Sequence, residues 1–231
     1  MNKNNVWFIT AKTNLHVGNE NTTSYGLIDL AVQRNATTGL PCINSSSLKG
    51  ALNEFASRFE DLDRVAIFGS DKKDKSKGSK KGRYTFFDAN ILFIPVQTGN
   101  ANMYELVTCE TVLNCFFDQV RLLTGEEITE DDLQDFKYTK LIDEEEVTEE
   151  KFNELCSNDS LPIIARNILD NGESRNLWYE QVVPAEAVFY TIIDDKEDGA
   201  LAKKIGAEKA LVQIGANATI GYGYCEFRNL K

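Results

Sequence analysis

Residues 26–50 read GLIDLAVQRNATTGLPCINSSSLKG and combine a lone carboxylate, Asp29, with the start of a helix. Apolar residues recur at three- and four-residue intervals across 45–59, which predicts an amphipathic helix. Asn44 and the serines after it are residue types that cap a helix N-terminus. The unpaired N–H groups and positive dipole end of such a helix suit a phosphate, and Lys49 adds a charge in its first turn. The serines, Ser45, Ser46 and Ser47, are equally typical of a surface helix that binds nothing.

The composition indicates a single domain that spans residues 1–231. With 42% hydrophobic residues, a chain of this length can bury a sizeable core. We expect a cytoplasmic protein that does not enter a membrane, because the chain has no long apolar run and no signal-peptide pattern at its start. The five cysteines are odd in number and form no C-x-x-C pair, which argues against a disulfide framework and a structural zinc site.

The net charge of −11 is concentrated in one segment. Residues 126–154 hold thirteen acidic residues against three lysines, so the rest of the chain carries a net charge of only −1. The overall charge therefore does not exclude a nucleic-acid ligand, although phosphate binding normally requires clustered Lys and Arg. We predict an acidic insertion at 124–160, which is either a helical surface element or a docking site for a basic partner.

A basic run follows the first predicted helix. DKKDKSKGSKKGR at 71–83 has seven basic and two acidic residues, and its glycines and serines predict a flexible loop. Such a loop is either simply solvated or a mobile arm that contacts a phosphate backbone or an acidic neighbour.

Strand and helix patterns alternate along the chain. Together they predict an α+β domain in which a ferredoxin-like sheet carries large insertions. The predicted strands are 6–17, 84–96 with an interruption near 88–90, 187–193, 210–214 and 224–227, and the predicted helices are 45–59, 108–123 and 199–205.

A glycine loop, Gly215 to Gly223, separates the last two predicted strands. Its glycines permit positive φ and close backbone approach, so the loop can present N–H groups to a phosphate. It matches neither a P-loop nor a dinucleotide fingerprint, which argues against ATP or NAD binding. A tight turn between two strands explains the same glycines without any ligand.

His16 is the sole histidine of the chain. Strict alternation along 6–17 would place it on the same face as Lys12 and Asn14. It is either a general acid or phosphate contact, or a strand histidine hydrogen-bonded for structural reasons.

Five blocks of sequence occur in an order that resembles one known family. They are a strand ending in His-Val-Gly, GLIDLAVQRNATTGLPCINSSSLKGAL, IFGS followed later by YTFFDA, NLWYEQVVP, and VQIGANATIGYG. In this order they resemble the backbone subunit (subunit 4) of CRISPR type III-B Cmr effector complexes, within the RAMP superfamily. The resemblance runs from about residue 6 to about residue 228 and is weakest over 98–170. Asn44 and Ala216 stand where the family has glycines, a departure that bears on RNA contacts more than on the fold.

The resemblance implies a RAMP core that is ferredoxin-like, as in RNA-recognition motifs, with a β-hairpin thumb. On this reading, residues 18–43 form the thumb and catalytic-loop insertion. The implied partners are CRISPR guide RNA, complementary target RNA, copies of the same chain in a filament and other Cmr subunits.

The resemblance also implies an endoribonuclease that cuts target RNA within the assembled complex and depends on a divalent metal ion, Mg²⁺ or Mn²⁺. Asp29 matches the catalytic aspartate, acting as proton acceptor or metal ligand, and His16 matches the histidine of the first block. Glu180 and Tyr179 are candidate auxiliary residues. The rings of Trp178 and Tyr179 can stack on a base, and buried aromatic packing explains them equally well. The residues expected to bind RNA are Arg34, Ser45, Ser46, Ser47, Lys49, Gly215, Thr219, Gly221 and Gly223.

Two other interpretations remain open. In one, the chain is a non-catalytic structural subunit that binds guide RNA, and Asp29 only shapes the thumb. In the other, it is an unrelated acidic α+β protein that binds a protein partner through 126–154.

Overall fold

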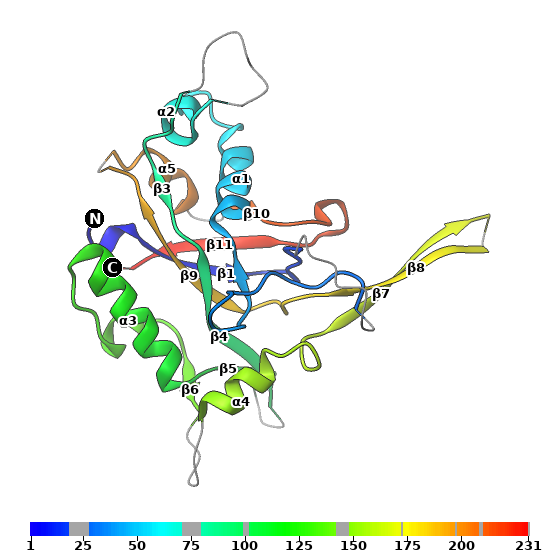
Figure 1. Ribbon diagram of the computed structural model, residues 1–231. Helices are drawn as coiled ribbons and strands as arrows, with labels where there is room; N and C mark the ends of the chain where they lie inside the picture. The colour runs from blue at the N-terminus through cyan, green and yellow to red at the C-terminus, as the bar shows by residue number, and fades with distance from the viewer. Residues whose placement is uncertain are drawn as a thin grey trace.

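A mixed nine-stranded sheet organises the part of the chain that the computed structural model describes (Figure 1). The described residues are 1–18, 28–70, 80–98, 102–141, 148–171, 173–196, 198–207 and 210–230. The strands of this sheet are β1 (Val6–Ala11), β2 (Cys42–Ile43), β3 (Thr85–Phe86), β4 (Ala89–Gln97), β5 (Tyr104–Thr108), β6 (Tyr138–Lys140), β9 (Val188–Asp194), β10 (Leu211–Gln213) and β11 (Tyr224–Asn229). A separate two-stranded hairpin consists of β7 (Ile163–Asp170) and β8 (Glu173–Gln181).

The main path through the sheet is β10–β11–β1–β9–β4–β5–β6, with β2 beside β4 and β3 beside β9. Neighbouring strands are antiparallel except for the parallel pair β5–β6. The helices are α1 (Ser45–Ala56), α2 (Arg64–Phe68), α3 (Glu110–Thr124), α4 (Thr148–Leu155) and α5 (Ala200–Ile205), with 3-10 turns η1 (Lys3–Asn5), η2 (Glu130–Leu133) and η3 (Ala218–Ile220).

Strand β1 lies inside the sheet and contributes to the core on both of its faces. Phe8 packs against Phe116 of α3, with ring centroids 5.8 Å apart, and against Phe136 at 4.9 Å. Trp7 points to the opposite face, where it lies against Gly206 at the end of α5. Because successive side chains of a strand alternate between faces, α3 and α5 cover opposite faces of the sheet.

Most of the predicted elements are present with shorter or shifted bounds. The mixed α and β architecture is confirmed, and the predicted interruption near 88–90 separates β3 from β4. The strand predicted over 6–17 is wrong beyond Ala11. The following residues keep isolated backbone contacts, such as the Lys12 N–H to the Tyr224 carbonyl at 2.8 Å and a bridge between Leu15 and Val183. The alternation used to place His16 therefore fails, and His16 is buried rather than on a polar face.

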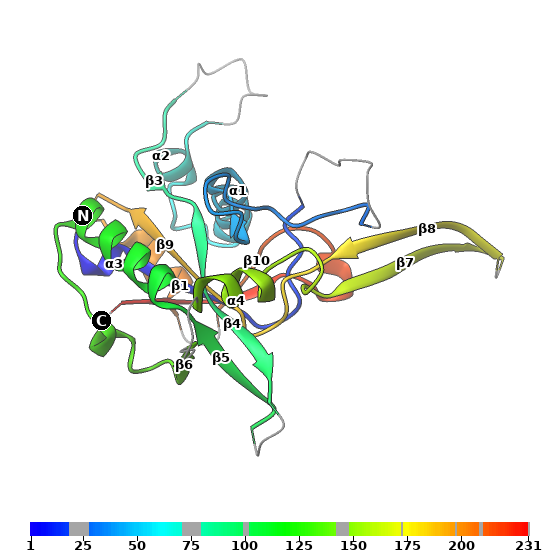
Figure 2. The ribbon, with the colours of Figure 1, turned by 60° about the horizontal axis from the view of Figure 1, so that its bottom comes forward.

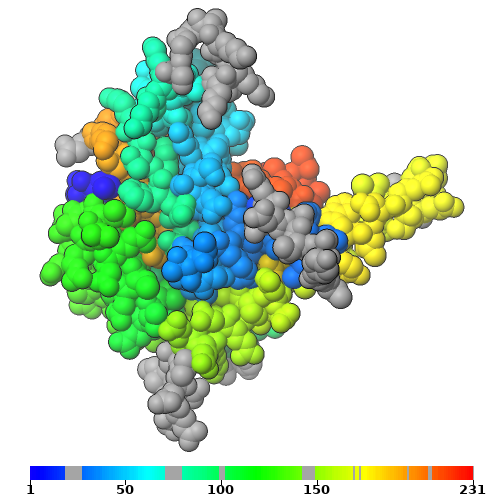
Figure 3. All heavy atoms as spheres, viewed as in Figure 1, coloured from blue at the N-terminus to red at the C-terminus, as the bar shows by residue number. Residues whose placement is uncertain are grey.

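The hairpin β7–β8 projects away from the body of the molecule, as Figures 2 and 3 show. The sequence did not predict it. Its side chains at Ile168 and Leu177 are 52% and 53% exposed, so the apolar alternation that marks a half-buried strand is absent.

The predicted insertions lie partly outside the described residues. Residues 19–27 of the 18–43 segment, 71–79 of the basic loop and 142–147 of the acidic segment are not described. The described part of 124–160 contains η2, β6 and α4. The described part of 18–43 contains isolated bridges and β2, and its role as a thumb stays a prediction. Among the described residues, no helix is both long and apolar enough to cross a membrane.

Candidate functional site

Asp29 is exposed and is fixed against the base of the projecting hairpin. Its backbone N–H donates to the carbonyl of Tyr179 at 3.0 Å, and its Oδ2 accepts the Tyr179 N–H at 2.7 Å. The chain then runs parallel to β8, where Gln181 donates its N–H to the carbonyl of Leu30 at 2.9 Å. These reciprocal bonds orient one carboxylate oxygen of Asp29. Among the described residues, Oδ2 is the only oxygen of this carboxylate with a hydrogen-bond partner.

Two buried glutamine side chains hold the segment that follows Asp29. Gln33 donates from Nε2 to the carbonyl of Gly18 at 3.1 Å and to Ser47 Oγ at 3.0 Å, while its Oε1 accepts the Asn44 N–H at 2.8 Å. Gln181 Oε1 accepts the N–H of Val32 at 3.3 Å. The segment is therefore anchored to both α1 and β8. Neither glutamine was predicted as functional, although both lie in blocks that carry the family resemblance.

The start of α1 differs from the expected open phosphate seat. Asn44 is the N-cap residue but its side chain makes no capping bond, and the N–H of Ser45 donates instead to the Asp88 carboxylate at 2.6 Å. Ser46 is exposed, Lys49 is partly exposed and Ser47 bonds to Gln33. An acidic side chain already satisfies one of the N–H groups that the phosphate was expected to use. This N-terminus is therefore only partly open, and its role as a phosphate seat stays a prediction.

A shallow groove brings α1 and the glycine loop together. Its volume is about 370 Å³. Ser47 of α1 lines it together with Gly18 and Gly215, which come from two segments far apart in the sequence. Glu54 lines one side of it. The complete lining is Val17, Gly18, Gln33, Ser47, Gly50, Ala51, Glu54, Gln213 and Gly215.

The glycine loop packs closely against the backbone of His16. A Cβ on Gly215 would lie 2.2 Å from the carbonyl oxygen of His16, and the N–H of Ala216 donates to that oxygen at 2.9 Å. Thr219 and Gly221 are exposed at η3 and its C-cap, whereas Gly223 is buried. The predicted glycine residues thus divide into packed positions and exposed positions.

His16 is buried among backbone and acidic groups. Its Nδ1 lies 2.7 Å from the carbonyl oxygen of Gln181 and 3.5 Å from Glu180 Oε1. Since a carbonyl can only accept, Nδ1 carries the proton, and only Nε2 is left for any acid–base role. Nε2 faces Gly18, where an added Cβ would lie 3.1 Å away.

Glu180 and Tyr179, the predicted auxiliary residues, have different environments. Glu180 is 2% exposed and pairs with Arg166 Nε at 3.0 Å and with the side-chain amide of Asn217. Tyr179 and Trp178 are partly exposed near the hairpin base, and Tyr179 makes its recorded bonds to Asp29 through its backbone. Glu180 is therefore closed off from RNA, whereas the two aromatic rings are not.

Arg34, the cation predicted to contact phosphate, makes internal contacts. It donates from Nη1 to the carbonyls of Gly39 and Cys156 at 2.9 and 2.7 Å, and from Nε to Asn158 at 3.1 Å. Burial lowers the pKa of its guanidinium, and its Nη2 is buried without a partner among the described residues. The contact between Arg34 and RNA stays a prediction.

The described residues contain no group of three or more His, Cys, Asp or Glu side chains that could hold a metal ion. Mg²⁺, however, is often bound by one or two carboxylates with substrate phosphates and water completing its shell. Asp29 is exposed and fits this second mode, in which RNA itself supplies ligands.

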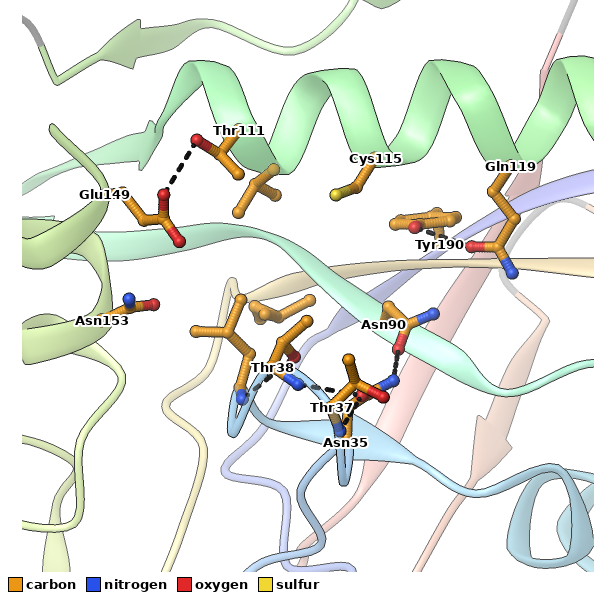
Figure 4. Close-up of a pocket in the computed structure, with 13 residues that line it drawn as sticks. Asn35, Thr37, Thr38, Asn90, Thr111, Cys115, Gln119, Glu149, Asn153 and Tyr190 are labelled. Carbon is orange, nitrogen blue, oxygen red and sulfur yellow. Dashed lines mark hydrogen bonds between the residues drawn. The ribbon is translucent and has the colours of Figure 1, made fainter.

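A pocket of about 390 Å³ lies between α3, α4 and the turn at 35–40 (Figure 4). Its polar side chains largely bond to one another, as in the pairs Tyr190 with Gln119 at 2.8 Å and Thr111 with Glu149 at 3.2 Å. No residue of the predicted site lines it.

Comparisons with known proteins agree on one family. The model of the RAMP superfamily matches residues 8–226. The chain is 27% identical over 263 aligned residues to the CRISPR system Cmr endoribonuclease Cmr4 of Pyrococcus furiosus, covering 87% of this chain and 88% of the relative.

Solved structures show the same fold. The chain is similar to one in the type III-B Cmr-beta complex bound to cognate target RNA, with a TM-score of 0.72, 23% identity, and 96% and 95% coverage of the two chains. It is also similar to oligomeric Cmr4 from Pyrococcus furiosus, with a TM-score of 0.63, 25% identity and 98% coverage of both chains.

Proposed function

This chain belongs to the RAMP superfamily, and we propose that it is the backbone subunit of a CRISPR type III-B effector complex that binds guide RNA and cleaves complementary target RNA. The observation that carries this proposal is the similarity, over most of both chains, to a Cmr endoribonuclease. The likeness to a chain of an RNA-bound Cmr complex is consistent with it.

The strand order supports a ferredoxin-like core for this subunit. The four strands β11, β1, β9 and β4 are neighbours in that order and each pair is antiparallel. With α1 between β1 and β4, and α5 between β9 and β11, this matches the β-α-β-β-α-β arrangement. On this reading β7–β8 is an insertion that acts as an arm for RNA or a neighbouring copy.

We place guide RNA along the groove between α1 and the glycine loop. The groove is lined by Ser47, Gly18 and Gly215, and Thr219 and Gly221, farther along the glycine loop, are exposed. Glycine positions allow a polynucleotide backbone to pass close to the main chain. Copies of the chain repeat this surface along the guide as a filament, together with the other Cmr subunits.

We propose Asp29 as the catalytic carboxylate. When RNA is cut by its own 2′-hydroxyl, that oxygen bonds to the adjacent phosphorus and its proton moves to an acceptor. The bond to the 5′ oxygen breaks, and this oxygen leaves with the bonding pair and takes a proton from water. Asp29 either accepts that proton or holds a divalent metal ion, Mg²⁺ or Mn²⁺, against the phosphate. Any contribution of His16 runs through Nε2. The fragments should carry a 2′,3′-cyclic phosphate and a 5′-hydroxyl.

The experiment compares assembled wild-type and Asp29→Asn complexes on a complementary RNA. Asparagine can still accept the Tyr179 N–H, so we expect assembly and RNA affinity to persist while cleavage falls by about 100-fold or more. Asp118→Asn, an exposed acid on α3, is the matched control and should cut normally. Undiminished cutting by Asp29→Asn would exclude the catalytic role and favour a structural RNA-binding subunit. Removing the metal ion with a chelator distinguishes the two roles of Asp29. Cleavage should persist if Asp29 only accepts the proton, and should stop if Asp29 holds the metal ion.

A further inference from the structure

Three segments that are distant in sequence converge on the buried carboxylate of Glu180. Arg166, on the other strand of the hairpin, donates from Nε to Oε2 at 3.0 Å. Asn217, in the glycine loop, donates from its side-chain amide to Oε1. His16 Nδ1 lies 3.5 Å from the same oxygen. We call Glu180, Arg166 and Asn217 the hairpin latch.

The latch joins the hairpin to the glycine loop at two points. Besides the shared contact at Glu180, the Arg166 guanidinium lies 4.6 Å from the centre of the Tyr222 ring. Asn217 has a φ of 66°, a left-handed conformation that asparagine tolerates well, and its side chain reaches Glu180 from there. A carboxylate that is 2% exposed requires such partners, because an unpaired buried charge is strongly unfavourable.

The position of Asp29 is set by Tyr179, the residue next to Glu180 of the latch. Tyr179, which precedes Glu180, exchanges two hydrogen bonds with Asp29. Gln181, which follows it, bonds to Leu30 and Val32. Any shift of β8 relative to the glycine loop therefore moves the Asp29 segment with it.

We propose that Glu180 is a positioning residue, which through Arg166 and Asn217 sets the angle between the glycine loop and the hairpin base and thereby places Asp29 over the RNA. This inference rests on the proposed function, since it assumes that the loop holds guide RNA and that Asp29 acts on the target. Glu180 itself touches no RNA. Its loss affects the cutting rate rather than RNA affinity.

Asn217→Gly tests the latch with little backbone strain, because glycine accepts a positive φ and loses only the amide. The matched control is Asn171→Gly, between β7 and β8 at the hairpin turn, where φ is 52°. Glu180→Gln, which keeps the shape and removes the charge, is the second variant. All are measured as assembled complexes with guide RNA.

We expect Asn217→Gly and Glu180→Gln to reduce the single-turnover cutting rate by about ten-fold, because each variant loses a hydrogen bond to a charged group. The affinity for target RNA should stay within about two-fold of the wild-type value. Amide hydrogen exchange at Tyr179 and Asp29 should accelerate in both variants and not in Asn171→Gly. Unchanged exchange and cutting, or a loss of affinity equal to the loss of rate, would overturn the proposal. If the wild type fails to cut RNA, the proposed function fails, while the exchange measurement still decides whether the latch holds Asp29.

Discussion

Gly221 and Gly223 lie in the same loop with the same backbone handedness but different surroundings. Their φ values are 83° and 78°. A Cβ added to Gly223 would lie 2.0 Å from the carbonyl oxygen of Ile214, whereas one added to Gly221 would meet nothing within 4 Å. Gly221 is needed only for its backbone conformation, whereas Gly223 is also needed because no side chain fits there.

This difference predicts unequal effects of the same substitution. Gly221→Ala should lower the free energy of unfolding by about 1–2 kcal/mol, the cost of a left-handed L-residue. Gly223→Ala should lower it by at least about 3 kcal/mol, because the backbone must also move away from the new methyl group. Denaturant unfolding of the purified chain measures both. Equal losses would contradict the packing described for Gly223.

At the residue scale, the sequence predicted conformation better than environment. The glycines of the C-terminal loop were noted as permitting positive φ, and Gly215, Gly221 and Gly223 all adopt it. His16 was placed on the wrong face, since its burial depends on Gln181 and Glu180, more than 160 residues away. Gln33 was overlooked although its partners Gly18 and Ser47 lie only 15 and 14 residues away, because no periodic pattern predicts contacts between irregular segments.

Helix α1 shows what periodicity can and cannot predict about an element. Its apolar spacing correctly indicated a helix starting at Ser45, but the helix ends at Ala56 rather than at residue 59. The state of its N-terminus could not be predicted, because the carboxylate that satisfies Ser45 comes from Asp88, on the connection between β3 and β4. Hairpin β7–β8 was missed because both of its faces are largely exposed and leave no alternation to detect.

Asp88→Ala tests whether the start of α1 is a phosphate seat. Loss of the bond to Ser45 should lower the free energy of unfolding by about 1 kcal/mol. Guide-RNA affinity at fixed salt should instead rise by about three-fold or more, because a negative charge leaves the seat and an N–H group is released. The measurements are denaturant unfolding of the free chain and filter binding of the assembled subunit.

Asp63→Ala is the matched control for this prediction. Asp63 caps α2 by accepting the Ala66 N–H at 2.9 Å, so its loss should cost similar stability. It should leave guide affinity unchanged, because α2 does not line the groove. A fall in affinity for Asp88→Ala, or no change, would mean that the guide phosphate lies elsewhere.

At the scale of the whole molecule, the order of motifs was more informative than any single motif. The acidic segment made the chain look unsuited to RNA, yet the family was recognisable from blocks at both ends, and the RAMP superfamily match covers residues 8–226. Tyr179 and Gln181 bond to the Asp29 segment within the same chain, which favours a cutting site centred on one copy. Each copy in a filament should therefore carry a separate cutting site, repeated at the spacing with which copies bind the guide.

Mixed assemblies test this independence. Complexes assembled from known proportions of wild-type and Asp29→Asn chains should produce evenly spaced cuts at the same positions as the wild type. If one Asp29 serves each cut, the cleavage rate at each position should fall in direct proportion to the wild-type fraction, so a half-and-half mixture retains about half of the rate. Sites that need two Asp29 carboxylates, for example to share a metal ion, would retain about one quarter, because both chains must be wild type. Quantifying the labelled fragments at each position distinguishes these outcomes, and a squared dependence would contradict a site built within one copy.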